Sequence, residues 1–125
     1  MEEIKSYFFD TYALYEIVHN SDSYSKYSKD IVVVTTRLNL MELHYILLRN
    51  YGLEKAERAY SFFLPFCVDV EDEIIKEANS FRLKNYKRDL SYIDCIGYVL
   101  SLKMNVKFLT GDEQFKDFEN VEFVK

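Results

Sequence analysis

The segment that decides the fold is IVVVTTRLNLMELHYILLRNYG, which runs from Ile31 to Gly52. It opens with four consecutive β-branched residues, a short apolar run that is typical of a strand buried on both faces of a parallel sheet. Thr35 or Thr36 can then cap a helix that continues to about Asn50, and Gly52 ends that helix. A buried strand followed directly by a long helix predicts an α/β fold.

The same alternation of strand and helix extends along the whole chain. The other predicted strands lie at residues 4–9, 66–70, 106–109 and 121–124. The other predicted helices lie at residues 12–18, 53–64, 71–86 and 90–104. The polar stretch 21–30 predicts a loop or a short surface helix. This pattern predicts a three-layer α/β/α sandwich with a central, mostly parallel sheet of about five strands.

Length and composition favour a single domain that covers residues 1–125. The chain has 125 residues, of which 49% are hydrophobic, and this is enough for one core. No apolar run reaches the roughly 18 residues that a membrane span needs. The segment from Met1 to Lys5 lacks the basic start and apolar stretch of a signal peptide. A cytoplasmic protein without membrane partners is therefore expected.

The cysteine and histidine content argues against a zinc site. Cys67 and Cys95 each lie in an apolar run and are expected to be reduced core residues. Neither has a second cysteine or a histidine at zinc-finger spacing, and His19 and His44 are far apart in sequence. The net charge of -5 excludes a protein that coats nucleic acid by bulk charge, but it allows an enzyme that grips phosphates through metal ions.

Four carboxylates stand out, two because they follow strands and two because they lie on apolar helices without a local cation. Asp10 follows the first predicted strand and Asp112 follows the fourth, so they should meet where the winding of the sheet reverses. Glu42 and Asp94 lie on apolar helices without Lys or Arg three or four positions away. Like charges that gather in one place repel unless a cation binds them, and hard oxygen ligands suit Mg²⁺ or Mn²⁺.

Each carboxylate also has an ordinary explanation when it is taken alone. Asp10 before a helix is a common N-cap, and Gly111-Asp112 is a common turn pair. Asp94 with Ser91 resembles a capping box, and Glu42 could reach a distant Arg or Lys. The order of the four acids, their locations and their missing partners together favour one shared metal site.

Four short motifs carry a resemblance to a known family. They are Phe8-Phe9-Asp10-Thr11, Asn39-Leu40-Met41-Glu42-Leu43, Leu90-Ser91-Tyr92-Ile93-Asp94 and Phe108-Leu109-Thr110-Gly111-Asp112-Glu113-Gln114-Phe115. In this order and spacing the chain resembles PIN-domain ribonucleases, and more closely the small single-domain toxins of VapBC-type toxin–antitoxin pairs. The resemblance covers nearly the whole chain.

The resemblance implies a site, an activity and partners. Asp10, Glu42, Asp94 and Asp112 map onto an acidic quartet that holds one or two divalent metals, Mg²⁺ or Mn²⁺. Thr110 matches a hydroxyl that supports the site, and Thr11 is expected to play a similar role. The implied activity is hydrolysis of single-stranded or looped RNA. The implied partners are an RNA substrate, a small antitoxin protein and a second copy of the chain in a homodimer. The first strand should lie at the sheet centre, between the second and the fourth.

Two further features have competing interpretations. The basic residues before the Asp94 helix could hold RNA phosphates or could form a solvated helix end that complements the dipole; they are Arg82, Lys84, Lys87 and Arg88. The many Tyr and Phe residues could stack on bases, but most are expected in the core. The apolar stretch from Tyr60 to Phe66 could be core or a dimer surface.

Rival functions are weaker or remain open. A phosphatase of the haloacid dehalogenase type needs a second acid two residues after Asp10, where this chain has Tyr12. A response-regulator receiver domain needs an acidic pair near the N-terminus, where only Asp10 follows the strand. A catalytically silent PIN-like module that binds a protein, and a free-standing RNA processing or decay nuclease without an antitoxin, remain the alternatives.

Overall fold

The computed structural model describes residues 4–125. Residues 1–3 lie outside that range. They are the start of the predicted domain and of the segment that was compared with a signal peptide. A sheet of four parallel strands runs through the centre: β1 (Lys5–Phe9), β2 (Ile31–Val34), β3 (Lys107–Thr110) and β4 (Val121–Phe123). The strand order is β2-β1-β3-β4. Since β3 corresponds to the fourth predicted strand, β1 lies between the second and the fourth predicted strands, as expected.

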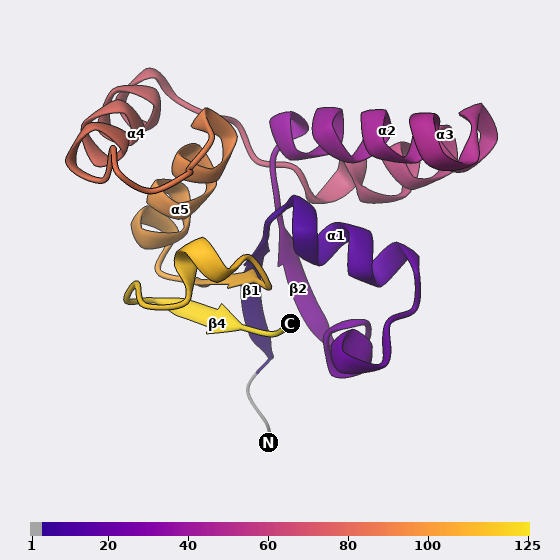
Figure 1. Ribbon diagram of the computed structural model, residues 1–125. Coiled ribbons are helices and arrows are strands. Elements are labelled where there is room, and N and C mark those ends of the chain that lie inside the picture. The colour runs from indigo at the N-terminus through magenta and orange to yellow at the C-terminus, as the bar shows by residue number, and fades with distance from the viewer. Residues whose placement is uncertain (1–3) are drawn as a thin grey trace.

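Helices cover both faces of this sheet (Figure 1). The α-helices are α1 (Thr11–Val18), α2 (Arg37–Tyr51), α3 (Leu53–Phe63), α4 (Asp72–Lys84) and α5 (Tyr92–Met104). Three short 3₁₀ helices are η1 (Asp22–Tyr27), η2 (Leu64–Phe66) and η3 (Glu113–Phe115). Helices α2 and α3 pack against each other, and α4 packs against α5. The predicted three-layer α/β/α sandwich with a parallel sheet is therefore confirmed.

The central strand β1 is buried on both faces of the sheet along its apolar half, Tyr7–Phe9, whereas Lys5 is exposed and Ser6 is partly buried at its start. The side chains alternate between two cores, because successive residues of a strand point to opposite faces. Tyr7 and Phe9 pack in the core that α1, α2 and α3 cover. Phe8 packs in the opposite core, under α4 and α5, where its ring stacks on Phe108 with 5.7 Å between the ring centroids. The half of the strand that leads to Asp10 is therefore apolar because both of its sides face a core.

Residues 66–70 do not form the predicted strand, and within residues 4–125 the sheet has four strands, close to the expected number of about five. The segment makes only an isolated parallel bridge between Thr35 and Cys67. The Thr35 N–H donates to the Phe66 carbonyl at 3.1 Å, and the Val68 N–H donates to the Thr35 carbonyl at 2.9 Å. Pairing stops there because the chain after Thr35 turns into α2 and offers no further extended backbone.

The polar stretch 21–30 forms η1, and it is anchored to the sheet more firmly than its composition predicts. Tyr24 and Tyr27 are buried. The Tyr24 hydroxyl donates to the Val124 carbonyl at 2.6 Å, and the Tyr27 hydroxyl donates to Glu122 Oε2 at 2.5 Å. Two aromatic side chains thus tie a serine-rich segment to the end of β4.

Two further expectations concern the cysteines and the membrane. Cys95 is buried in the core under α4 and α5, Cys67 is partly buried, and both are free, as expected. In the part of the chain that the structure describes, no helix is long and apolar enough to cross a membrane.

Replacing Gly97 of α5 by Ala is expected to destabilise the fold. A Cβ at this position would lie 2.8 Å from Cε1 of Phe8 and 3.2 Å from Cε1 of Phe108, and both rings are fully buried. Overpacking of a core costs ~1–3 kcal/mol, which should outweigh the ~1 kcal/mol that Ala gains over Gly in a helix. Urea unfolding should show a lower midpoint for Gly97→Ala, whereas an unchanged or higher midpoint would mean that α5 can shift away from the sheet.

Candidate active site

All four predicted carboxylates line one cavity of about 710 Å³. Asp10 directly follows β1, Asp112 follows β3, Glu42 lies in α2, and Asp94 lies in the first turn of α5. Since β1 and β3 are parallel neighbours, their carboxyl ends deliver Asp10 and Asp112 to the same edge of the sheet. Segments that are far apart in sequence therefore converge at the place where parallel sheets commonly bind ligands.

Asp10 is both a helix cap and a buried acid. Its Oδ1 accepts the Ala13 N–H at 2.9 Å, so the N-cap interpretation is correct. The side chain is only 4% exposed. The pKa of Asp10 is raised to about 8, mainly by burial and also by the nearby Asp94 and Asp112, although hydrogen bonds from Thr110 and Ala13 act to lower it. A cap alone does not need a desolvated carboxylate beside two other acids.

Asp94 likewise combines two roles. The capping box is present: the Asp94 N–H donates to Ser91 Oγ at 3.0 Å, and the Ser91 N–H donates to Asp94 Oδ2 at 2.9 Å. The same carboxylate lines the cavity. Burial raises the pKa of Asp94, and Asp112 and Glu42 add to this, while the bonds to Ser91 lower it. The capping box thus holds the Asp94 carboxylate at the cavity that the other three acids line.

Glu42 is held by a chain of side-chain hydrogen bonds. The Thr11 hydroxyl donates to Glu42 Oε1 at 2.6 Å, and Asn39 Nδ2 donates to Thr11 Oγ1 at 3.2 Å. The Thr36 hydroxyl donates to Asn39 Oδ1 at 2.6 Å. Among residues 4–125, Glu42 forms no ion pair, so the expected alternative of a distant Arg or Lys is not what the structure shows.

The buried Asn39 was not among the candidate residues drawn from the sequence. It lies three residues after the cap Thr36 and three before Glu42, which places all three on one side of α2. That spacing is the signal that could have found it. Thr11, in contrast, contacts Glu42 as the expected supporting role requires.

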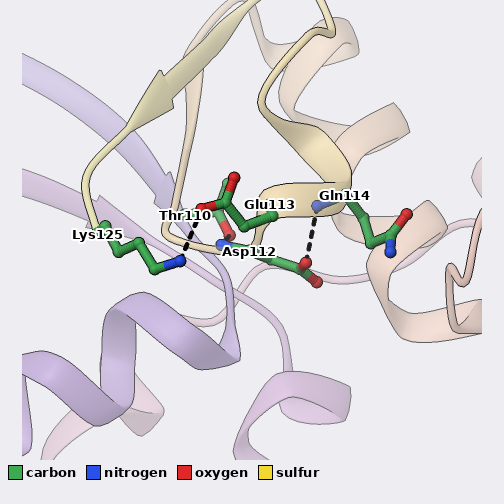
Figure 2. Close-up of polar contacts among 5 residues, drawn as sticks. All are labelled: Thr110, Asp112, Glu113, Gln114 and Lys125. Atoms are coloured by element: carbon green, nitrogen blue, oxygen red, sulfur yellow. Dashed lines mark hydrogen bonds and ion pairs between the residues drawn. The ribbon is translucent and has the colours of Figure 1, made fainter.

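Asp112 is fixed by the tight loop after β3 (Figure 2). Its Oδ1 accepts the Gln114 N–H at 2.9 Å, and its own N–H donates to Thr110 Oγ1 at 3.0 Å. The preceding Gly111 has no room for a side chain, because a Cβ there would overlap the Tyr12 ring and the Val124 carbonyl oxygen. Thr110 thus contacts both Asp10 and the Asp112 loop, the place where its expected supporting role would be exerted.

Glu113 and Lys125 also line the cavity and were missed from the sequence. Lys125 Nζ donates to Glu113 Oε1 at 2.6 Å, and Figure 2 shows the amine directed at that carboxylate. Lys125 is the one basic residue of the lining, and its ion pair is with Glu113 rather than with any of the four acids. The charge of the quartet is therefore not balanced by an ion pair from residues 4–125.

The four carboxylates fit a divalent cation in their chemistry but are not arranged as a finished coordination shell. Within residues 4–125, no group of three or more Asp, Glu, His or Cys side chains is placed to hold a metal ion. Each acid instead accepts a local hydrogen bond; the donors are the Ala13 N–H, the Thr11 hydroxyl, the Ser91 N–H and the Gln114 N–H. The lining has hard oxygen donors and neither His nor Cys, a set that suits Mg²⁺ or Mn²⁺ better than Zn²⁺.

The predicted basic patch is divided between separate surfaces. Arg82 and Arg88 line a pocket of about 300 Å³ beside the start of α5. Lys87 lies over the ring of Tyr86, 5.9 Å from its centroid. Lys84 belongs to a different pocket, which it shares with Glu77 and Lys103. The structure therefore brings together the two arginines but not Lys84.

Comparisons with known proteins agree with this architecture. The family model of the PIN domain matches residues 7–121. The solved structure of VapC20 from Mycobacterium tuberculosis has a TM-score of 0.78 and 19% identity, and the match covers 95% of this chain and 99% of that one. VapBC2 from Rickettsia felis gives a TM-score of 0.72 at 19% identity, with 96% and 99% covered. A comparison with curated protein sequences found no match.

These structural likenesses show the shared fold, and the family model adds the shared ancestry. The model covers both strands that carry Asp10 and Asp112, and it covers the helices of Glu42 and Asp94. The match of this model over nearly the whole chain shows that the protein belongs to the PIN domain family.

Proposed function

We propose that this protein is a metal-dependent endoribonuclease that hydrolyses single-stranded or looped RNA. The observation that carries the proposal is the convergence of Asp10, Glu42, Asp94 and Asp112 on one cavity without an ion-pair partner among the described residues. The residues of the quartet would hold Mg²⁺ or Mn²⁺. Such a cation, when bound, makes water more acidic and neutralises the charge that develops on a phosphate during hydrolysis.

The chain itself supplies the positions of the donors. Ser91 orients Asp94, and Thr11 with Asn39 orients Glu42. The short loop after β3 fixes Asp112, while the start of α1 fixes Asp10. The four carboxylates are thus held on four different segments around one cavity.

The choice of RNA as substrate rests on the similar proteins and on the family. VapC20 is described as a toxin that cleaves the sarcin–ricin loop, which is a looped RNA. The chain shares its fold over nearly its whole length. We therefore assign the same class of substrate, without assigning the same RNA.

A protein partner is also part of the proposal. Similar folds occur in toxin–antitoxin complexes, among them VapBC2 from Rickettsia felis and a complex from Klebsiella pneumoniae. Helix α2 exposes Met41, Tyr45 and Leu48, which are spaced so that they form one apolar stripe. We propose this stripe as a surface for a small antitoxin.

A homodimer is a further proposal. The stretch from Tyr60 to Phe66, which could be core or a dimer surface, has residues of both kinds. Phe63 is buried in the core, whereas Phe62 and Phe66 are exposed. Phe62 lines a groove of about 720 Å³ together with residues of α1. Size-exclusion chromatography with light scattering, run on the natively expressed chain, would measure the copy number and reveal any co-purified small protein.

The nuclease proposal is tested by RNA cleavage with purified protein that is free of bound inhibitor. Fluorescent single-stranded and hairpin RNAs should be cut with Mg²⁺ or Mn²⁺, and EDTA should stop the reaction. Glu113→Gln is the matched control, because it removes a carboxylate of the same cavity that lies outside the quartet. Varied RNAs that stay intact with both metals would contradict the proposal.

A further inference from the structure

We propose that the pocket beside the start of α5 is a stacking subsite for one nucleobase of the RNA strand, with Tyr92 as the stacking ring. This inference rests on the proposed function, since it names a second contact of the same substrate. The pocket has a volume of about 300 Å³ and is lined by residues of α4, α5 and the connection between them: Asn79, Arg82, Leu83, Tyr86, Arg88, Leu90 and Tyr92.

Exposed aromatic rings are the first reason. Tyr92 is 62% exposed and Tyr86 is 71% exposed, and both rings line the same pocket. The Arg82 guanidinium lies over the Tyr92 ring, 4.2 Å from its centroid. One face of the ring is thus covered by a cation, and the exposure of the side chain leaves the other face open to solvent.

The charge of the pocket is the second reason. Its lining contains two arginines and no Asp or Glu, in a chain whose net charge is -5. Arg82 is held in place because its Nε donates to the Leu90 carbonyl at 3.0 Å. A fixed cation beside an open aromatic ring suits a base with an adjacent phosphate, which is the arrangement that single-strand binding proteins use.

Continuity with the acidic cavity is the third reason. Tyr92 is the first residue of α5 and Asp94 the third, so the rise between the two residues along the helix axis is only ~3 Å, although their side chains lie on different sides of the helix and line different pockets. Arg88 links the two sides: its Nη1 donates to the Gln114 carbonyl at 2.7 Å, and the Gln114 N–H donates to Asp112. In this proposal, a strand whose phosphate lies at the quartet passes around the start of α5 and places a neighbouring base on the Tyr92 ring.

Arg88 has a different part from Arg82. Besides its bond to Gln114, it lies over the Phe118 ring and 3.9 Å from Asp117. Its charge is therefore partly compensated, and it acts mainly as a positioning residue for the Asp112 loop. This leaves Tyr92 and Arg82 as the pair that contacts the base and its phosphate.

The test measures binding of a short fluorescent single-stranded RNA by anisotropy, in EDTA so that no cleavage occurs. Loss of a stacking ring should weaken binding roughly 5- to 100-fold in Tyr92→Leu, while Tyr92→Phe, which keeps the ring, should bind as the wild type does. Tyr51→Leu is the matched control, because Tyr51 is 51% exposed and also carries a cation, Lys55, over its ring, with Nζ 4.3 Å from the ring centroid.

Binding of an RNA that keeps its phosphates but lacks bases distinguishes the contribution of base stacking from that of charge. An RNA with abasic positions should bind the wild type more weakly than the normal strand does, and Tyr92→Leu should bind both strands alike. Three results would each overturn the subsite: wild-type affinity in Tyr92→Leu, an equal loss of affinity in Tyr51→Leu, or no preference of the wild type for the strand that carries bases.

Cleavage by the same proteins distinguishes this inference from the proposed function. If the wild type binds RNA through Tyr92 but leaves it intact with Mg²⁺ and Mn²⁺, the nuclease proposal fails and the stacking subsite stands. If Tyr92→Leu cleaves with the KM of the wild type and binds equally well, the subsite fails and the nuclease proposal stands.

Discussion

Asp10→Asn is expected to abolish RNA cleavage. In the absence of metal, the stability of the wild type should decrease strongly as the pH rises, and the stability of Asp10→Asn should not. Asn keeps the size of Asp and is an equally good N-cap, so the bond to the Ala13 N–H can persist. The change removes only the charge. The cleavage rate should fall strongly, because a neutral amide oxygen replaces a charged ligand and the charge of the ligands sets the affinity of such a site for a divalent cation.

The pH dependence follows from the raised pKa of Asp10, about 8 in the fold against an ordinary value near 4 in the unfolded chain. Between these values the folded protein holds a proton that the unfolded chain has released. The free energy of unfolding of the wild type should therefore fall as the pH rises from about 4 to about 8, with a slope that approaches ~1.4 kcal/mol per pH unit.

Urea unfolding in EDTA at pH 5, 6 and 7 measures this slope. Asp10→Asn should flatten it, and Asp72→Asn, which neutralises an exposed acid at the start of α4, should leave it unchanged. Since the cluster titrates as a set, the slope belongs to the quartet with Asp10 as its main member. Parallel slopes for the wild type and Asp10→Asn would show that this carboxylate is not desolvated in solution.

Asp94 has two proposed roles, in the cap of α5 and in the metal site, and the variants Ser91→Ala and Asp94→Asn are expected to affect them separately. Ser91→Ala removes the hydroxyl that accepts the Asp94 N–H, and loss of such a cap costs ~1 kcal/mol. The carboxylate of Asp94 remains, so Mn²⁺ should still stabilise the protein. At 100 times the dissociation constant the gain is ~2.7 kcal/mol.

Asp94→Asn should show the opposite pattern. Its amide oxygen can still accept the Ser91 N–H, and removal of one of four mutually repelling charges should leave the metal-free stability near neutral pH unchanged or higher. The gain from Mn²⁺ should disappear. Thermal melts of the wild type and both variants, with and without Mn²⁺, give the comparison. A full Mn²⁺ gain in Asp94→Asn would exclude this residue from the metal site.

The fold was predictable where the sequence pattern has only one physical meaning. The run from Ile31 to Val34 and the apolar end of β1 form parallel strands as predicted, and the long helix after Thr36 has a clear cap and a clear end. The first of these strands is less buried than its sequence suggests, because β2 lies at the edge of the sheet and Val32 is exposed. Residues 66–70 show the limit. Their alternation of apolar and polar residues suits a strand, but whether a strand forms depends on a neighbour, and β2 ends too early to provide one.

The candidate site was predictable in its members but not in its geometry. Strand ends and missing cations were enough to select the four acids, since both features can be counted along the chain. The bonds that hold each acid apart from the others depend on side-chain directions, which the sequence does not encode locally. Lys125 was missed for the same reason, because its ion pair with Glu113 spans two loops.

The capping interpretations show that two explanations of one residue can both be right. Asp10 and Asp94 cap their helices, and they also face the same cavity. A cap fixes the direction of a carboxylate at low cost, because the backbone N–H groups it satisfies are available at every helix start. The helix starts of α1 and α5 therefore position acids as well as stabilise helices.

Direct measurement of Mn²⁺ binding by electron paramagnetic resonance tests the central claim, that the four carboxylates form one cation site. The wild type should bind Mn²⁺, and Asp10→Asn, Glu42→Gln, Asp94→Asn and Asp112→Asn should each weaken binding at least roughly tenfold, since even residues that only support a ligand have effects of that size. Glu113→Gln, in the same cavity but paired with Lys125, should bind as the wild type does. A wild type that binds no Mn²⁺, or four quartet variants that bind it as well as the wild type, would contradict the account.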